Sequence, residues 1–133
     1  MITLPGGGQV IVRSATEGIR GAGLDGVVID EAALVDPKIW SEVIRPALVD
    51  KQGWATFFST PKGLNWFHRL FKSELPGWQS WQLPSSTNPL VSEKELESAR
   101  LEMGPRAFNQ EHLAQFLEVE GALWPAEYFH DLL

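Results

Sequence analysis

The most constraining feature of the sequence is a short β-branched run that ends in two carboxylates. Residues 26–29 read Gly-Val-Val-Ile, and Asp30 and Glu31 follow directly. Continuous runs of this kind are typical of strands that are buried on both faces of a parallel sheet. We therefore expect a buried strand that delivers two acidic side chains to its carboxyl end.

A second apolar run ends in hydroxyl groups. Residues 54–59 read Trp-Ala-Thr-Phe-Phe-Ser, and Thr60 and Pro61 come next. Between the two runs, Asp36 and Pro37 form a strong helix start, and apolar residues follow at helical spacing to about position 49. A strand, a helix and a second strand in this order predict an α/β fold with a mostly parallel sheet. In such sheets, ligands bind beyond the carboxyl ends of the strands.

The flanking regions predict further elements. Before position 84 we expect a hairpin over 2–14, a glycine-rich loop with one helical turn over 15–26, a helix over 64–73 and a strand over 78–83. Beyond it the pattern is helical, because Ser92 and Glu95 form a capping box that opens a helix to about position 103. Gly104 and Pro105 end that helix and start another, whose apolar side chains can face inward: Phe108, Leu113, Phe116 and Leu117.

The bulk composition excludes several function classes. The formal net charge of −6 speaks against a free-standing nucleic-acid binder. Lys62, Arg69 and Lys72 could still share a basic face, which is either a DNA contact or an ordinary solvated surface. The chain has no cysteine, so disulfides and thiolate metal sites are excluded. Its apolar stretches are far shorter than the ~20 residues that span a bilayer, and no secretory signal opens it, so we expect a cytoplasmic protein.

The two strand ends carry groups that suit nucleotide hydrolysis. Asp30 could hold Mg²⁺ and Glu31 could orient the water that attacks a γ-phosphate, provided that the strand end curls. Ser59 and Thr60 could sense that phosphate if the strands are neighbours. The simpler alternatives are a capping role for Asp30 and a local turn at the two hydroxyls. Arg20 lies in the glycine-rich loop, where a guanidinium could reach a phosphate or remain solvated.

A phosphate-binding loop is absent from the sequence. The pattern GxxxxGK followed by Ser or Thr occurs nowhere: the glycines at 6–8 precede Gln9 and Val10, and Lys62 stands before Gly63. The isolated chain is therefore expected neither to bind nor to hydrolyse ATP appreciably. The three histidines lack metal-ligand spacing, so we expect no metal other than Mg²⁺.

Several segments, in the same order, resemble the large terminase subunits of tailed phages. Residues 21–32 resemble that family's Walker B region, and residues 55–67 resemble its coupling motif in the form STP.G..W. Residues 86–90, the helix after them and residues 108–116 resemble its lid segment. The resemblance implies a partial RecA-like fold of the ASCE P-loop NTPase class, with a C-terminal helical lid segment.

The same resemblance implies a function in packaging viral DNA into procapsids, with ATP hydrolysis driving translocation. Asp30 matches the Mg²⁺ ligand, Glu31 the catalytic glutamate, and Ser59 and Thr60 the coupling segment. Arg20 falls where some members place a trans-acting arginine finger. The implied cofactors are ATP and Mg²⁺. The implied partners are double-stranded DNA, the portal, the small terminase subunit and other copies of the motor subunit in a ring, and no membrane is implied. The implied location is the host cytoplasm or a virion assembly intermediate.

The resemblance also predicts how the chain is divided. Residues 1–84 would form the C-terminal part of the ATPase core, 85–122 the helical lid or linker, and 123–133 the beginning of a nuclease. A Walker A segment would precede Met1, which implies a gene fragment, one piece of a split gene or a truncated form. Two alternatives remain open: a segment of another ASCE NTPase such as a DEAD-like helicase, in which Asp or His would replace Ala33, and a non-catalytic remnant that acts as an interaction module.

Overall fold

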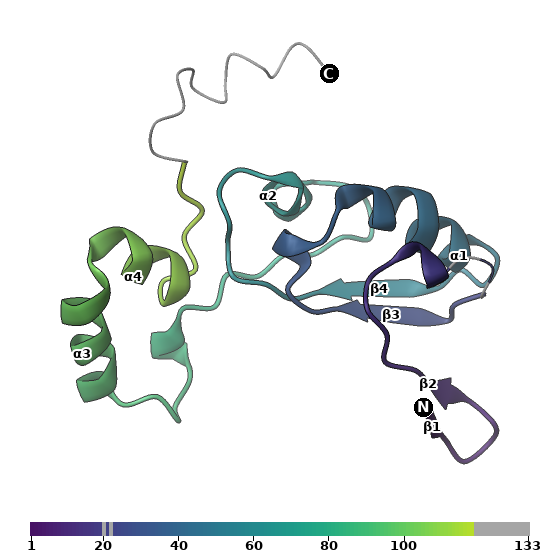
Figure 1. Cartoon of the computed structure of the whole chain (residues 1–133), viewed down its shortest axis with the longest axis horizontal. Coiled ribbons are helices and arrows are strands. Elements are labelled where there is room, and N and C mark those ends of the chain that lie inside the picture. Colours follow the sequence, from purple (N-terminus) through teal and green to yellow (C-terminus); the bar gives the residue numbers. More distant parts are fainter. Residues whose placement is uncertain (20, 22, 119–133) are drawn as a thin grey trace, which may run out of the picture. The chain divides into compact units, whose positions relative to one another are not determined.

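The chain forms two compact units. The computed structural model describes residues 1–118 except 20 and 22. The first unit consists of residues 1–29 and 35–56, and the second of residues 30–34 and 57–133. Figure 1 labels the helices and strands of both units.

The N-terminal part of the first unit is the expected hairpin. Strands β1 (Ile2–Thr3) and β2 (Gln9–Val10) pair in antiparallel fashion, with Ile2 opposite Val10. The turn between them uses positive backbone angles at two glycines, with φ of 98° at Gly6 and 88° at Gly7. Glycine adopts this conformation without the clash of a Cβ atom, which explains the glycine run. The 3₁₀ turn η1 (Glu17–Ile19) is the helical turn predicted in the loop that follows.

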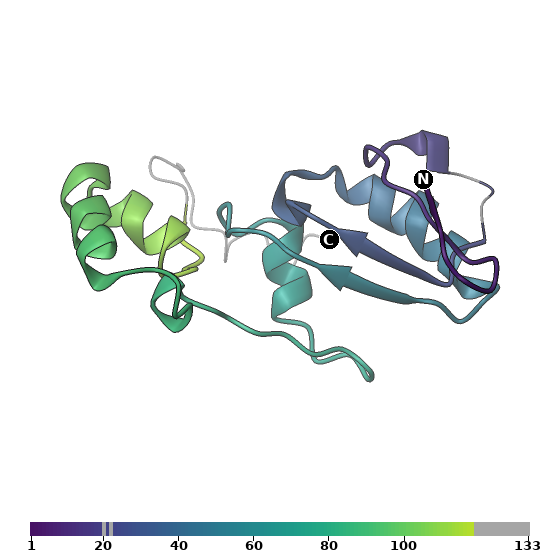
Figure 2. The same cartoon turned by 90° about the horizontal axis from the view of Figure 1, so that it is seen from below.

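The main sheet of the first unit joins β3 (Gly26–Ile29) to β4 (Trp54–Phe57). Both strands run in the same direction, as Figure 2 shows, so the predicted parallel pair is confirmed. The connecting helical segment covers one face of this pair (Figure 1). Its buried apolar side chains are Val43, Ile44 and Leu48, which form the core of this unit together with Ile29 of β3.

The connecting segment is helical to Val49, as expected, but only part of it is an α-helix. It consists of the π-helix η3 (Ile39–Ile44) and the α-helix α1 (Arg45–Val49). Within it, the Arg45 N–H donates to the Trp40 carbonyl, five residues back. Pro46 comes next, and proline has no N–H to donate and clashes with the preceding turn of a regular α-helix. The wider π turn accommodates this proline inside a continuous helical segment.

Gly53 connects α1 to β4 at a point where no side chain fits. Its N–H donates to the Leu48 carbonyl at 2.9 Å. A Cβ atom at this position would lie 2.5 Å from the Leu24 carbonyl oxygen and 2.7 Å from the Leu48 Cδ2 atom. Since one of these neighbours is backbone, only glycine lets the chain turn this tightly into the strand.

The second unit is mostly helical. Its elements are η2 (Ala32–Leu34), α2 (Trp66–Phe71), η4 (Ser85–Thr87), α3 (Glu93–Met103) and α4 (Pro105–Glu111). The Ser92 hydroxyl accepts the Glu95 N–H at 3.1 Å, which confirms the predicted start of α3. Gly104, with φ of 74°, turns the chain from α3 into α4, and these two helices pack together.

Three predictions about the fold are wrong. Residues 78–83 form no strand, and within them the Gln82 side chain donates to the carbonyls of Leu113 and Ala114. The β3–β4 pair is not buried on both faces: Val28 is 57% and Trp54 is 59% exposed, since in the described part of the chain the connecting helical segment covers only one face (Figure 1). Helix α4 ends at Glu111, so three of the apolar residues expected on its inner face lie beyond it: Leu113, Phe116 and Leu117. These three are half-buried, whereas Phe108, inside the helix, is buried.

No helix in the described part of the chain combines the length and the hydrophobicity of a membrane span.

Candidate functional site

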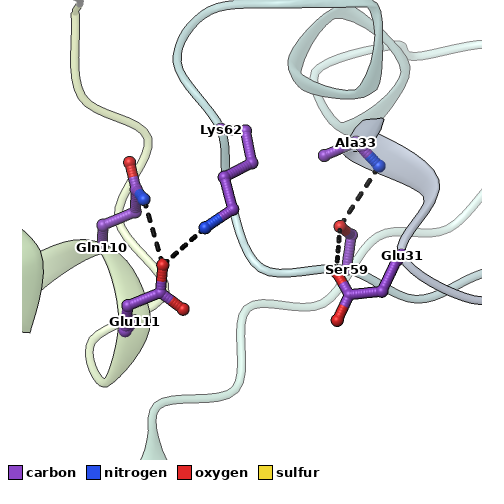
Figure 3. A network of polar contacts seen from close by, with 6 residues as sticks. All are labelled: Glu31, Ala33, Ser59, Lys62, Gln110 and Glu111. Carbon is purple, nitrogen blue, oxygen red and sulfur yellow. Dashed lines mark hydrogen bonds and ion pairs between the residues drawn. The ribbon is translucent and has the colours of Figure 1, made fainter. Parts of the chain in front are cut away.

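The two polar strand ends lie side by side, as predicted. The Ala32 N–H donates to the Phe58 carbonyl at 3.0 Å, so the segments after β3 and β4 stay paired beyond the strands. The Ser59 hydroxyl donates to Glu31 Oε2 at 3.4 Å (Figure 3). A carboxylate and a hydroxyl that are 28 residues apart in sequence therefore meet at one place in the second unit.

The hydrogen bonds of Ser59 fix the direction of its proton. The Ala33 N–H, which can only donate, points at Ser59 Oγ from 3.1 Å. The hydroxyl accepts this bond and keeps its own proton for Glu31. Ser59 thus connects the backbone of one segment to the carboxylate of another, as Figure 3 shows.

The backbone of Glu31 has the curl that the sequence analysis required. Its φ is 50°, in the left-handed region that non-glycine residues rarely adopt. The Glu31 N–H donates to Asp30 Oδ1 at 3.0 Å. A left-handed non-glycine residue costs about 1–3 kcal/mol and persists only where its surroundings hold it. The hydrogen bonds at Ala32 and Ala33, immediately after Glu31, provide that support.

The structure describes two of the remaining predicted site residues, Asp30 and Thr60. Asp30 is exposed, and a single exposed carboxylate fits Mg²⁺, which prefers oxygen ligands and retains several waters. No cluster of three or more potential metal ligands exists among the described residues. Thr60 is half-buried, and its hydroxyl makes no hydrogen bond within the described part of the chain. Arg20 lies outside the described residues.

Asn65 is a polar residue of the site that the sequence analysis did not single out. Its Nδ2 atom donates to the Ala33 carbonyl at 2.8 Å. Its Oδ1 atom accepts the N–H groups of Phe67 and His68, so the same side chain caps α2. Asparagine is a preferred N-cap, and its place directly before the apolar face of α2 was the signal that could have identified it.

A second polar contact connects the segment after β4 to α4. Lys62 Nζ lies 2.6 Å from Glu111 Oε1, which also accepts a hydrogen bond from Gln110 (Figure 3). The hydrogen bond from Lys62 holds the pKa of Glu111 below its ordinary value. Glu111 ends α4, where the helix dipole disfavours a carboxylate, so Lys62 offsets an unfavourable position.

An aromatic cluster around Phe116 packs against α2. The Phe116 ring lies 6.0 Å from Phe67, 4.8 Å from His68 and 5.2 Å from Phe71, measured between ring centroids. Burial lowers the pKa of His68, and the nearby Lys72 and Arg69 lower it further. The segment that follows α4 is therefore anchored on α2 by ring contacts.

The basic face predicted around α2 is only partly available to a partner. Lys62 is engaged by Glu111, and Lys72 Nζ lies 5.9 Å from the centroid of the Phe71 ring. Arg69 is exposed on α2. A DNA contact on the remaining basic face, where Arg69 and Lys72 are both exposed, stays a prediction.

With this geometry established, comparison with known proteins identifies the family. The family described as "Terminase large subunit, T4likevirus-type, N-terminal" matches residues 1–131. The chain belongs to this family. This membership decides against the alternative of a DEAD-like helicase segment.

Individual terminases are similar to parts of the chain. The chain is 51% identical over 63 residues to the terminase large subunit of Thermus phage G20c, covering 47% of this chain and 12% of that protein. It is 33% identical over 110 residues to the terminase large subunit of Escherichia phage T5, covering 78% of this chain and 25% of that protein. The chain thus spans a quarter or less of these relatives.

A solved structure supports the fold. The large terminase ATPase domain of Thermus phage P74-26 is 33% identical to this chain, with a TM-score of 0.57. The match covers 75% of this chain and 47% of that domain structure. At this identity the likeness supports a mixed α/β fold of the terminase ATPase type.

Proposed function

We propose that this chain forms the carboxylate half of the ATPase site in the large subunit of a viral DNA-packaging terminase. The observation that carries the proposal is the contact between Ser59 and Glu31, in which a hydroxyl after β4 holds the carboxylate that follows β3. Glu31 Oε2 accepts this bond at 3.4 Å, and the carboxylate keeps lone pairs on both oxygens for a water molecule. A carboxylate held in this way can orient and deprotonate the water that attacks the γ-phosphate of ATP.

In this proposal, the other site residues act on the nucleotide around Glu31. Asp30 would hold Mg²⁺, and bound Mg²⁺ supplies charge neutralisation at the phosphate oxygens. Ser59 would keep the general base in place, and the hydroxyl of Thr60, the next residue, would sense the γ-phosphate. Arg20 would stabilise transition-state charge from a neighbouring subunit, as an arginine finger does.

The complete motor would be assembled from more than this chain. Residues 1–84 would complete a RecA-like ATPase core, 85–122 would form its helical lid, and 123–133 would begin a nuclease. The P-loop would come from a segment outside this sequence. The partners would be double-stranded DNA, the portal, the small terminase subunit and further motor subunits in a ring, in the host cytoplasm.

The proposal is tested by adding a phosphate-binding loop on a second polypeptide. The full 133-residue chain is assayed for ATP hydrolysis alone and when mixed with a P-loop polypeptide, which is a separately produced terminase large-subunit segment that carries GxxxxGK followed by Ser or Thr. The chain alone should be inactive and the mixture active. Glu31→Gln should then lower kcat by about 10²–10⁴-fold, since it removes the general base. Glu42→Gln, at another exposed glutamate on η3, is the matched control and should leave activity unchanged.

A second candidate function is a non-catalytic interaction module. It is favoured by the apolar side chains exposed on the strands and just after them, Val28, Trp54 and Phe58. Such a module would bind the P-loop polypeptide without nucleotide turnover. Binding in the mixture without ATP hydrolysis would therefore replace the motor proposal with this one.

A further inference from the structure

Asn65 is fixed in one orientation by three hydrogen bonds. Its Nδ2 atom donates to the Ala33 carbonyl at 2.8 Å, while Oδ1 accepts from Phe67 N at 3.1 Å and from His68 N at 3.3 Å. Exchanging the nitrogen and oxygen atoms would set acceptor against acceptor and donor against donor. The amide therefore has two separate functions, one toward α2 and one toward the segment that follows Glu31.

The residue that Asn65 holds is also held by Ser59. The N–H of Ala33 donates to Ser59 Oγ, and its carbonyl accepts from Asn65 Nδ2. Ala33 is 8% exposed and the preceding Ala32 is fully buried, so water does not compete freely for these groups. The peptide groups on both sides of Ala33 are thus fixed, only two residues beyond the left-handed Glu31.

We propose that Asn65 is a positioning residue for Glu31. It acts through the Ala33 carbonyl, and the inference rests on the proposed function, in which Glu31 is the general base. The strained Glu31 backbone needs its surroundings to hold it. Asn65 supplies one of these restraints from α2, and Ser59 supplies another from the segment after β4. Removing the restraint should let the turn after β3 relax and move the carboxylate away from its working position.

Asn65→Asp separates the two functions of this side chain. Aspartate caps a helix as well as asparagine does, so α2 should keep its start. It has no donor for the Ala33 carbonyl and places a carboxylate oxygen against it. Asn65→Ser also caps the helix, adds no charge and is too short to reach Ala33, so it separates loss of the donor from added charge. Asn88→Asp is the control for charge, because Asn88 Oδ1 accepts the Leu90 N–H and needs no donor there.

The first measurement is residue-resolved hydrogen exchange by NMR on the full chain. In both Asn65 variants, exchange at Ala32 and Ala33 should accelerate about tenfold or more, while Phe67 and His68 at the start of α2 should keep their protection. Asn88→Asp should change neither region. Unchanged exchange at Ala32 and Ala33 in Asn65→Asp and Asn65→Ser would overturn the inference.

The second measurement is ATP hydrolysis after mixing with the P-loop polypeptide. Asn65→Asp and Asn65→Ser should lower kcat about tenfold and leave the KM for ATP within about twofold, because the base is displaced and the nucleotide is still bound. A wild-type mixture without activity would count against the proposed function, whereas the exchange result would still decide whether Asn65 holds the turn. An active mixture in which both variants retain full kcat would overturn the positioning role.

Discussion

The two units of this chain are stabilised in different ways. In the first unit, Ile44 and Leu48 are each 1% exposed, and apolar burial dominates. Its ion pair, Lys51 with Asp25, lies at the surface, with side chains 47% and 85% exposed. In the described part of the second unit the buried residues are Ala32, Ala33, Pro61 and Phe108. Its other contacts include hydrogen bonds, an ion pair and half-buried aromatic rings.

This difference indicates which unit depends on directional contacts. Burial of aliphatic side chains is non-directional and holds a scaffold without specifying one arrangement. Hydrogen bonds such as those of Ser59 and Asn65 specify one geometry and are lost when a partner moves. The candidate catalytic carboxylate belongs to the second kind of structure, so its position depends on a few polar contacts that are lost when a partner moves.

The largest effect is expected in the core of the first unit. Leu48→Ala removes a fully buried side chain and leaves a cavity, which costs about 2–5 kcal/mol in the free energy of unfolding. Urea unfolding followed by NMR signals of the first unit measures this loss. Val49→Ala, at an exposed position in the same helix, should change stability by less than about 0.5 kcal/mol. Equal losses in the two variants would contradict a core centred on Leu48.

A smaller effect is expected in the aromatic cluster of the second unit. Phe116→Ala removes ring contacts to Phe67, His68 and Phe71. Because Phe116 is half-buried, we expect a loss of about 2 kcal/mol, below that of a core phenylalanine. Signals of α2 and of the segment after α4 should broaden, while those of the first unit stay unchanged. Phe58→Ala, where the ring is 57% exposed, is the matched control and should cost less.

A still smaller effect is expected at the ion pair between Lys62 and Glu111. Both side chains are about one-third exposed, so Glu111→Gln should cost less than about 1 kcal/mol at neutral pH. The pKa of Glu111 is lowered in the folded chain, so the pair stabilises the fold above about pH 4.5 and this contribution is lost as the pH falls through the folded-state value.

Stability measured against pH for wild type and Glu111→Gln checks this expectation. The two curves should converge on acidification, and the contribution of His68 cancels because both proteins retain it. Lys51→Met removes the more exposed pair of the first unit and should have the weakest effect of all. A wild-type advantage over Glu111→Gln that persists at low pH would contradict the assignment of this ion pair.

The sequence predicted those elements whose signals are local. The hairpin at Gly6 and Gly7, the helix cap at Ser92 and the break at Gly104 depend on backbone preferences of neighbouring residues, and all three are confirmed. The predicted strand over 78–83 is wrong because alternation does not reveal whether a neighbouring strand exists. The Gln82 side chain instead donates to two backbone carbonyls that lie more than 30 residues away in sequence.

Some features of the candidate site were likewise predictable from the sequence, and others were not. The order of motifs predicted that Asp30 and Glu31 would finish one strand and that Ser59 would finish its neighbour, because parallel strands place their carboxyl ends together. The contacts of Asn65 with Ala33 and of Lys62 with Glu111 were not predictable, because they join residues 32 and 49 positions apart in sequence.

By itself the sequence determined which chemical groups stand at the strand ends and in which order the motifs follow, since both depend on residue identity and short-range preference. Only the tertiary structure decided that Ser59 donates to Glu31, that Glu31 adopts a left-handed backbone and that Asn65 holds the following turn. The physical reason is that a hydrogen bond needs its donor and acceptor close together and roughly in line, and distant segments meet that condition only after the chain has packed.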